Sequence, residues 1–175
     1  MSDKNFYQYT ESGLSNVYIT AGKVLTNDVG EKVYEVGNVK VWNALIAFSL
    51  ITKPFPLSNL EIRYLRKYMR MTQSKLATLL SKTRVTASRW ENGTLEMDKN
   101  AEIVLRLSAL ELVRTSQLID MAVSTSISIS DFMPEPQLPP DTPYIIEISA
   151  EFIRFTLSNP CESKKVNFSA INLTG

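Results

Sequence analysis

The middle of the chain repeats apolar residues at intervals of three and four, which is the spacing of helices with one buried face. One such segment begins at Ser58, which forms a capping-box pair with Glu61. Thr72 and Thr83 can each cap a further helix, because a hydroxyl accepts a hydrogen bond from amides left free at a helix start. The pattern predicts three short helices, the last two joined by a tight turn at residues 81–82. Their expected core is Ile62, Leu65, Met69, Leu76, Ala77, Leu79, Leu80, Ala87 and Trp90.

Further helices are expected on both sides of this region. Residues 41–52 form an apolar run that predicts a buried helix, and the two prolines at positions 54 and 56 end it. Asp98 can cap a long helix from about residue 99 to residue 122. Apolar side chains of this last helix spread around more than one side, so it has a second surface to cover.

Strand-like patterns lie toward the two ends of the chain. Residues 17–20 and 32–36, separated by turn-prone residues, predict a small meander. Residues 124–130 alternate polar and apolar side chains, and residues 144–157 and 164–173 are rich in Ile, Phe and Val. The last two runs predict a β-rich appendage. It either offers a docking surface for a partner or a second subunit, or extends the edge of the N-terminal sheet.

The helix expected after Thr83 has two unlike faces. Ala87 and Trp90 point one way, and a polar, basic face points the other. An α-helix fits the major groove of B-DNA, where arginine can donate two hydrogen bonds to guanine and an apolar side chain can contact a thymine methyl. The residues expected to read bases on this face are Arg84, Val85, Ser88 and Arg89.

Charge is unevenly distributed, although the net charge is only +1. Residues 57–93 hold eight Lys or Arg against two Asp or Glu, a local charge of +6, and residues 94–175 hold six against eleven, a local charge of −5. Cations concentrated in this way suit a phosphate backbone. A helical stripe of four, Arg63, Arg66, Lys67 and Arg70, is either a track along DNA phosphates or an ordinary solvated face; Arg70 is the strongest candidate for a phosphate contact.

Residues 72–93 resemble the lambda-repressor-like (Xre, Cro/CI-type) helix-turn-helix family. The family signature is matched by Gln73, by Leu76 with Ala77, and by the run Ser-Arg-Trp-Glu-Asn-Gly at 88–93, whereas Ser81 replaces the usual glycine of the turn. The resemblance implies base and nearby backbone contacts around residues 83–89 and a phosphate contact at Gln73. The expected DNA-backbone contacts are Arg70, Thr72, Gln73, Lys75, Thr83 and Thr86.

A narrower resemblance, over about residues 9–107, is to MqsA-type antitoxins and related zinc-finger regulators. In that family two Cys-x-x-Cys pairs bind zinc in an N-terminal domain that binds a toxin in some members. This chain has Cys161 as its only cysteine and has no histidine, so it cannot assemble a tetrahedral zinc site of nitrogen and sulfur ligands within one subunit. The N-terminal region is expected to fold without metal, and no cofactor is expected.

The predicted fold class is α+β. A central all-α lambda-repressor-like helix-turn-helix domain is expected with a small β-containing N-terminal region and a β-rich C-terminal appendage. The expected boundaries are 1–53 for the metal-free α+β region, 54–123 for the helix-turn-helix DNA-binding domain, 124–143 for a Pro-rich linker and 144–175 for the appendage.

The favoured function is a dimeric, sequence-specific DNA-binding transcriptional regulator, most simply a repressor that controls its own operon. The surplus apolar surface of helix 99–122 favours a homodimer, whose two recognition helices would read half-sites about 34 Å apart on double-stranded DNA. The alternative is an antitoxin-like protein that binds and neutralises a partner protein, with DNA binding as feedback.

An enzyme is not expected. The chain has no histidine to serve as a general base, no nucleophile motif around Cys161 and no glycine-rich phosphate loop. Glu147 and Glu151 are more typical of surface charge than of a carboxylate pair. Nor does the chain have a long apolar run or a signal-peptide pattern, so a cytoplasmic location is expected.

Overall fold

The computed structural model describes residues 6–20, 23–35, 37–53, 55–116, 144–148, 152–157 and 167–172. The helices are the short 3-10 helix η1 (Thr10–Ser12), α1 (Val39–Thr52), α2 (Asn59–Tyr68), α3 (Gln73–Leu79), α4 (Arg84–Glu91) and α5 (Lys99–Thr115). The strands are β1 (Phe6–Gln8), β2 (Val17–Thr20), β3 (Lys23–Thr26), β4 (Lys32–Glu35), β5 (Tyr144–Ile148), β6 (Phe152–Leu157) and β7 (Asn167–Asn172). The strand predicted at 124–130 and the linker proline run at 134–143 lie outside the described residues.

The predicted helix starts are confirmed by their caps. Ser58, Thr72, Thr83 and Asp98 each accept a hydrogen bond from the backbone amide three residues later. At Ser58 the capping box is complete, since the Glu61 carboxylate also accepts a hydrogen bond from the Ser58 amide at 2.7 Å. Because these bonds join residues only three positions apart, they fix where the helices begin through local interactions.

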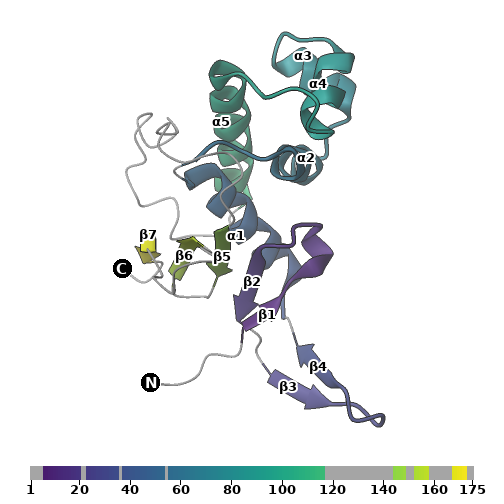
Figure 1. Ribbon diagram of the computed structural model, residues 1–175, viewed down its shortest axis with the longest axis vertical. Coiled ribbons are helices and arrows are strands. Elements are labelled where there is room, and N and C mark those ends of the chain that lie inside the picture. Colours follow the sequence, from purple (N-terminus) through teal and green to yellow (C-terminus); the bar gives the residue numbers. More distant parts are fainter. Residues whose placement is uncertain are drawn as a thin grey trace.

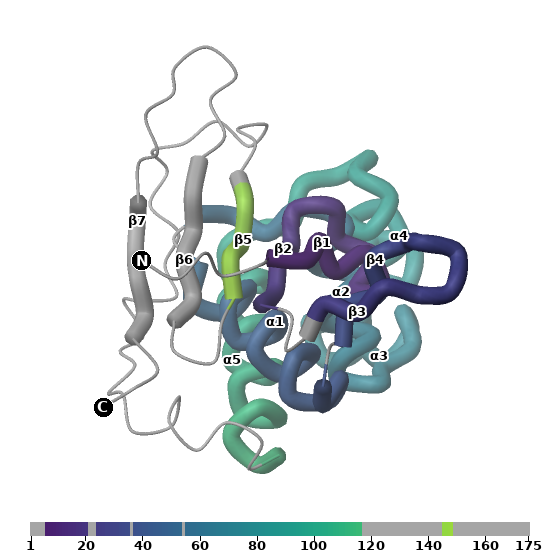
Figure 2. The backbone as a smooth tube through the Cα atoms, turned by 90° about the horizontal axis from the view of Figure 1, so that it is seen from below, coloured from purple at the N-terminus to yellow at the C-terminus, as the bar shows by residue number. Residues whose placement is uncertain are grey.

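The main sheet has five strands in the order β1-β2-β5-β6-β7. Strands β2 and β5 are parallel, with Val17 opposite Ile146, and the other neighbours in the sheet are antiparallel. Figures 1 and 2 both show β1, β2 and β5 side by side with α1 beside them. Residues far apart in the sequence therefore share one sheet, as expected from the alternative in which the C-terminal run extends the edge of the N-terminal sheet.

The predicted meander is wrong. Strands β2 and β4 do not belong to one sheet: β4 pairs with β3 in a separate hairpin, whereas β2 pairs with β1 and β5. Strands β1 and β3 were missed. The residue pattern within 17–36 gives no sign that a strand more than a hundred residues away becomes the neighbour of β2. In Figure 1 the β3–β4 hairpin extends away from the helices, at the opposite end of the molecule from α3 and α4.

One continuous hydrophobic core joins the sheet to the helices. Val17, Ile19, Ile146 and Ile148 are buried on the sheet, and they belong to the same cluster as the buried side chains of all five α-helices. Burying such side chains is the main source of folding free energy. The predicted core is confirmed except at Leu79, which is 39% exposed, and at Met69, which is partly buried and packs against the core. The buried face of α3 is centred on Leu76, Ala77 and Leu80, and Leu79 lies at its edge.

A buried ionic cluster fixes the segment between α1 and α2. The Arg106 guanidinium on α5 is fully buried and donates hydrogen bonds to the carbonyl oxygens of Ile51, Lys53 and Phe55 at 2.7–2.9 Å. It also donates to Glu102 on its own helix at 2.6 Å. Because these bonds run from α5 to the end of α1 and the connection after it, they fix that connection against α5.

Candidate nucleic-acid interface

The turn between α3 and α4 places Ser81 in a left-handed backbone conformation. Ser81 has φ of +53°, in the left-handed region that usually favours glycine. The Ser81 amide donates to the Thr78 carbonyl at 3.1 Å, and the Lys82 amide donates to the Ala77 carbonyl at 2.8 Å. Lys82 also pairs with Asp98, at 3.1 Å, which ties the turn to the start of α5. Serine therefore takes the place of the expected glycine without disrupting the turn.

Helix α4 presents the two faces that were predicted. Ala87 and Trp90 are buried in the core, whereas Arg84 and Arg89 are exposed and Val85 is 60% exposed. Ser88, between them, is half-buried. The predicted orientation is confirmed, and the four candidate base-reading residues lie on the side of α4 that faces away from the core.

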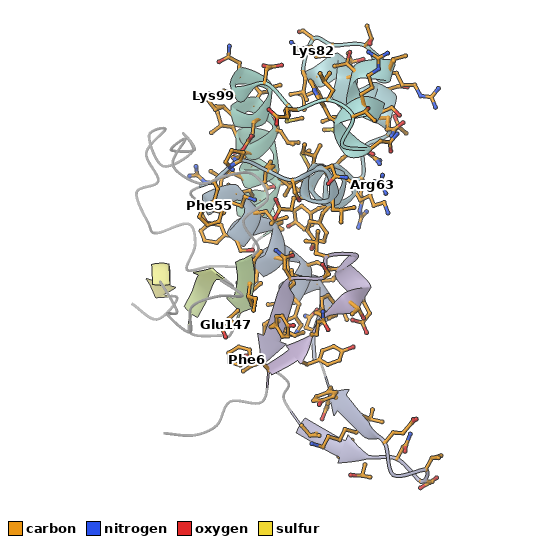
Figure 3. The ribbon with its side chains drawn as sticks, in the orientation of Figure 1. Phe6, Phe55, Arg63, Lys82, Lys99 and Glu147 are labelled. Atoms are coloured by element: carbon orange, nitrogen blue, oxygen red, sulfur yellow. The ribbon has the colours of Figure 1, made fainter. Side chains whose placement is uncertain are left out.

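Glu91, the last residue of α4, is the centre of an ion-pair network that links three helices. Its carboxylate is only 1% exposed and accepts two hydrogen bonds from Arg66 of α2, to Oε1 and, at 2.9 Å, to Oε2. Gln73 of α3 donates to Oε2 at 3.0 Å. Arg63 of α2, labelled in Figure 3, donates to the Glu91 carbonyl at 3.0 Å. The orientation of α4 is thus fixed by charged hydrogen bonds from both preceding helices.

The same network determines the protonation of Glu91. Burial by itself raises the pKa of the carboxyl, but hydrogen bonds from Arg66 and Gln73 and the charges of Arg66 and Arg63 outweigh it, so the pKa lies below its usual value. Glu91 is the one acidic residue of α4, and Arg66 neutralises it. No described residue forms an ion pair with Arg84 or Arg89, so the exposed face of α4 remains positively charged.

The predicted stripe of four cations, three on α2 and Arg70 just after it, is divided by the fold. Arg66 is bound to Glu91 and is 13% exposed, so at this residue the stripe is neither a phosphate track nor an ordinary solvated face. Arg63 is also engaged, with the Glu91 carbonyl and the Asn92 side chain. Lys67 and Arg70 are exposed, on the part of the surface where α2 ends. The linear pattern could not show that a carboxylate on α4 would take two members of the stripe.

The predicted backbone-contact residues are arranged around the starts of α3 and α4. Thr72 and Lys75 are exposed, and the Thr72 hydroxyl accepts a hydrogen bond from the Lys75 amide at 3.2 Å. Thr83 and Thr86 are joined by a 2.9 Å hydroxyl contact at the start of α4. Gln73 is half-buried and uses its side-chain amide to hold Glu91.

The positioning role of Glu91 was missed by sequence reasoning. The sequence places Glu91 directly after the core residue Trp90 and two arginines on α2, but it does not show that these arginines reach Glu91. Elsewhere, the described residues contain no group of three or more His, Cys, Asp or Glu side chains that could hold a metal ion. No helix within the described ranges is long and apolar enough to cross a membrane.

Comparison with known proteins agrees with this geometry. Residues 62–110, from the first turn of α2 to the middle of α5, match a helix-turn-helix family model of the lambda-repressor-like (Xre) type. No curated protein and no solved structure matches the chain. The match includes both members of the Arg66–Glu91 pair and all of α3 and α4, so residues 62–110 constitute a helix-turn-helix domain, a type of domain that binds DNA.

Proposed function

We propose that the protein is a sequence-specific DNA-binding transcriptional regulator that inserts α4 into the major groove, and that it has no catalytic role. The observation that carries the proposal is the exposed face of α4, where Arg84, Val85 and Arg89 point away from the core. The acidic residue of the helix, Glu91, is buried and paired with Arg66. Arginine and an apolar side chain are suited to the edges of guanine and thymine.

Base-reading and backbone contacts have separate roles in this proposal. Arg84, Val85, Ser88 and Arg89 read bases, whereas the exposed side chain of Lys75 approaches a phosphate at the start of α3. Phosphate contacts place the helix in the groove, and base contacts select the sequence. Specificity and salt dependence should therefore respond to different substitutions.

We also propose that the protein acts as a homodimer on a palindromic operator, as a repressor of its own operon. Support comes from α5, where Val104 and Leu107 remain 40% and 37% exposed although the opposite side of the helix is buried in the core. One recognition helix contacts few base pairs, and a two-fold pair would read half-sites about 34 Å apart. The footprint and stoichiometry of the operator complex test this step.

The test of DNA reading is a titration against labelled DNA from upstream of the gene, with random competitor DNA. Wild type should bind selectively, and Arg84→Ala/Arg89→Ala should lose selectivity. Arg89→Ala alone should cost about 1–3 kcal/mol and relax base preference at one position, whereas Lys75→Ala should weaken binding to all sequences and lower the salt slope by about one. Lys32→Ala is the matched control, because Lys32 is exposed on the hairpin far from α4.

Equal losses on operator and random DNA for Arg89→Ala and Lys75→Ala would contradict the base-reading role of Arg89. Absence of selective binding by the wild type to the upstream DNA would count against autoregulation, and selection of binding sites from a random library would then ask whether the protein reads any sequence.

An antitoxin-like function is the second candidate, and the β3–β4 hairpin is the observation that favours it. Leu25 and Val33 are opposite each other on the two strands and are both exposed, and Val29 at the tip is 83% exposed. Apolar side chains gathered on a projecting hairpin are suited to a protein partner. Co-expression with the neighbouring reading frame should then yield a complex that Leu25→Asp/Val29→Asp disrupts without loss of operator binding.

A further inference from the structure

A pocket on the side of the helix-turn-helix domain remains unexplained by DNA reading. It has a volume of about 570 Å³ and lies where α1, the end of α2 and the end of α5 meet the turn between β1 and β2. Cavities of this size hold small organic molecules. Its lining consists of Glu11, Ser12, Lys40, Asn43, Tyr64, Lys67, Tyr68, Met69, Arg70, Leu112 and Ser116.

Three cations from different elements converge on this pocket. Lys40 belongs to the first turn of α1, Lys67 to the last turn of α2, and Arg70 to the segment that follows α2. Within the described part of the chain, none of these side chains forms a hydrogen bond or an ion pair. The one acidic lining residue, Glu11, accepts a hydrogen bond from the Tyr7 hydroxyl at 2.8 Å. The lining therefore has a net charge of +2 and suits an anion.

The remainder of the lining is largely apolar and aromatic. Tyr64, Tyr68, Met69 and Leu112 contribute ring and aliphatic surface. The Tyr64 hydroxyl donates to the Asn43 carbonyl oxygen at 3.1 Å, so its polar end is already satisfied. Burial raises the pKa of both tyrosines above the usual value, so both phenols are neutral and do not repel an anion.

Arg70 adopts an unusual backbone conformation at this site. Its φ is +54°, in the left-handed region that an arginine seldom occupies. The Arg70 amide donates to the Lys67 carbonyl at 2.9 Å, and the Met71 amide donates to the Arg66 carbonyl at 3.0 Å, which closes the end of α2. The turn at the end of α2 therefore keeps the backbone of Arg70 close to that of Lys67.

We propose that this pocket is a binding site for a small organic anion, with an aromatic body against Tyr64 and Tyr68 and an acidic group between Lys67 and Arg70. The acidic group is a carboxylate or a phosphate ester, since either can pair with a lysine and an arginine. Such a site uses Arg70 and Lys67 for a ligand instead of a DNA phosphate. The proposal does not depend on the function of α4.

The test uses 8-anilinonaphthalene-1-sulfonate, an aromatic anion whose fluorescence rises on binding, with the full-length protein. One probe should bind per chain, and Lys67→Gln/Arg70→Gln should raise its Kd at least tenfold. Lys32→Gln/Lys99→Gln removes the same charge at exposed positions that do not line the pocket and should leave the Kd within twofold. The uncharged analogue N-phenyl-1-naphthylamine should bind the wild type more weakly than the anion does.

Competition identifies the acidic group. Stronger displacement of the probe by phenyl phosphate than by benzoate assigns a phosphate ester, and the reverse assigns a carboxylate. Displacement by neither overturns the proposal, as do equal effects of the two double variants on probe binding. If Lys67→Gln/Arg70→Gln weakens binding to random DNA but leaves the probe Kd unchanged, the two cations serve DNA and the pocket is not an anion site.

Discussion

Arg66 on α2 donates two hydrogen bonds to the buried carboxylate of Glu91, the last residue of α4. Because a guanidinium and a carboxylate meet in a fixed two-pronged geometry, this pair determines both the distance and the rotation of α4 relative to α2. Gln73 adds a third hydrogen bond from α3. The direction in which the exposed side of α4 faces therefore depends on hydrogen bonds made by Glu91 on the buried side of the helix.

Breaking the Arg66–Glu91 pair should destabilise the domain. Arg66→Met leaves the Glu91 carboxylate buried without its bidentate arginine partner. We therefore expect a loss of about 2–4 kcal/mol in the free energy of unfolding, measured by urea denaturation. Arg66→Met/Glu91→Leu should recover part of the loss, because it removes both charges. Arg114→Met, at an exposed position of α5, should change stability by less than about 0.5 kcal/mol. Equal stability of Arg66→Met and Arg114→Met would show that the pair contributes nothing.

The lowered pKa of Glu91 makes stability depend on acid pH. A carboxyl whose pKa is lower in the folded than in the unfolded state contributes stability that is fully present above its unfolded pKa, about 4.3, and is lost as pH falls through the folded pKa. Urea denaturation at pH 7 and pH 3 should therefore show a smaller loss on acidification for Glu91→Gln than for wild type. Glu96→Gln, at an exposed position, is the control. An unchanged loss in Glu91→Gln would exclude Glu91 as the titrating group.

Local signals in the sequence were sufficient to predict the helices and the faces of α4. Ser58, Thr72, Thr83 and Asp98 cap helices through bonds to residues three positions later, so their effect can be read from a short window. Ala87 and Trp90 likewise follow from helical spacing.

Contacts between distant segments could not be read in this way. That the C-terminal run extends the N-terminal sheet was one of two open alternatives, but the parallel pairing of Val17 with Ile146 depends on the whole chain path, and the nearby run at residues 32–36 was a plausible but wrong partner. Glu91 belongs to the recognised signature, yet its capture of Arg66 and Arg63 required knowledge of how α2 crosses α4. The pocket at Lys40, Lys67 and Arg70 is likewise assembled from elements that no sequence window contains.

Replacing Ser81 by glycine should stabilise the domain. Ser81 has φ of +53°, and the left-handed conformation costs a residue with a side chain about 1–2 kcal/mol, which glycine avoids. Greater freedom of glycine in the unfolded chain offsets about 0.4–1 kcal/mol, so the expected net gain is about 0.5–1 kcal/mol by urea denaturation. Ser81→Val should destabilise the domain, because a β-branched residue fits this conformation worst, and Ser81→Ala should stay near wild type. If Ser81→Gly gave no gain in stability and Ser81→Val caused no loss, the left-handed conformation of Ser81 would be contradicted.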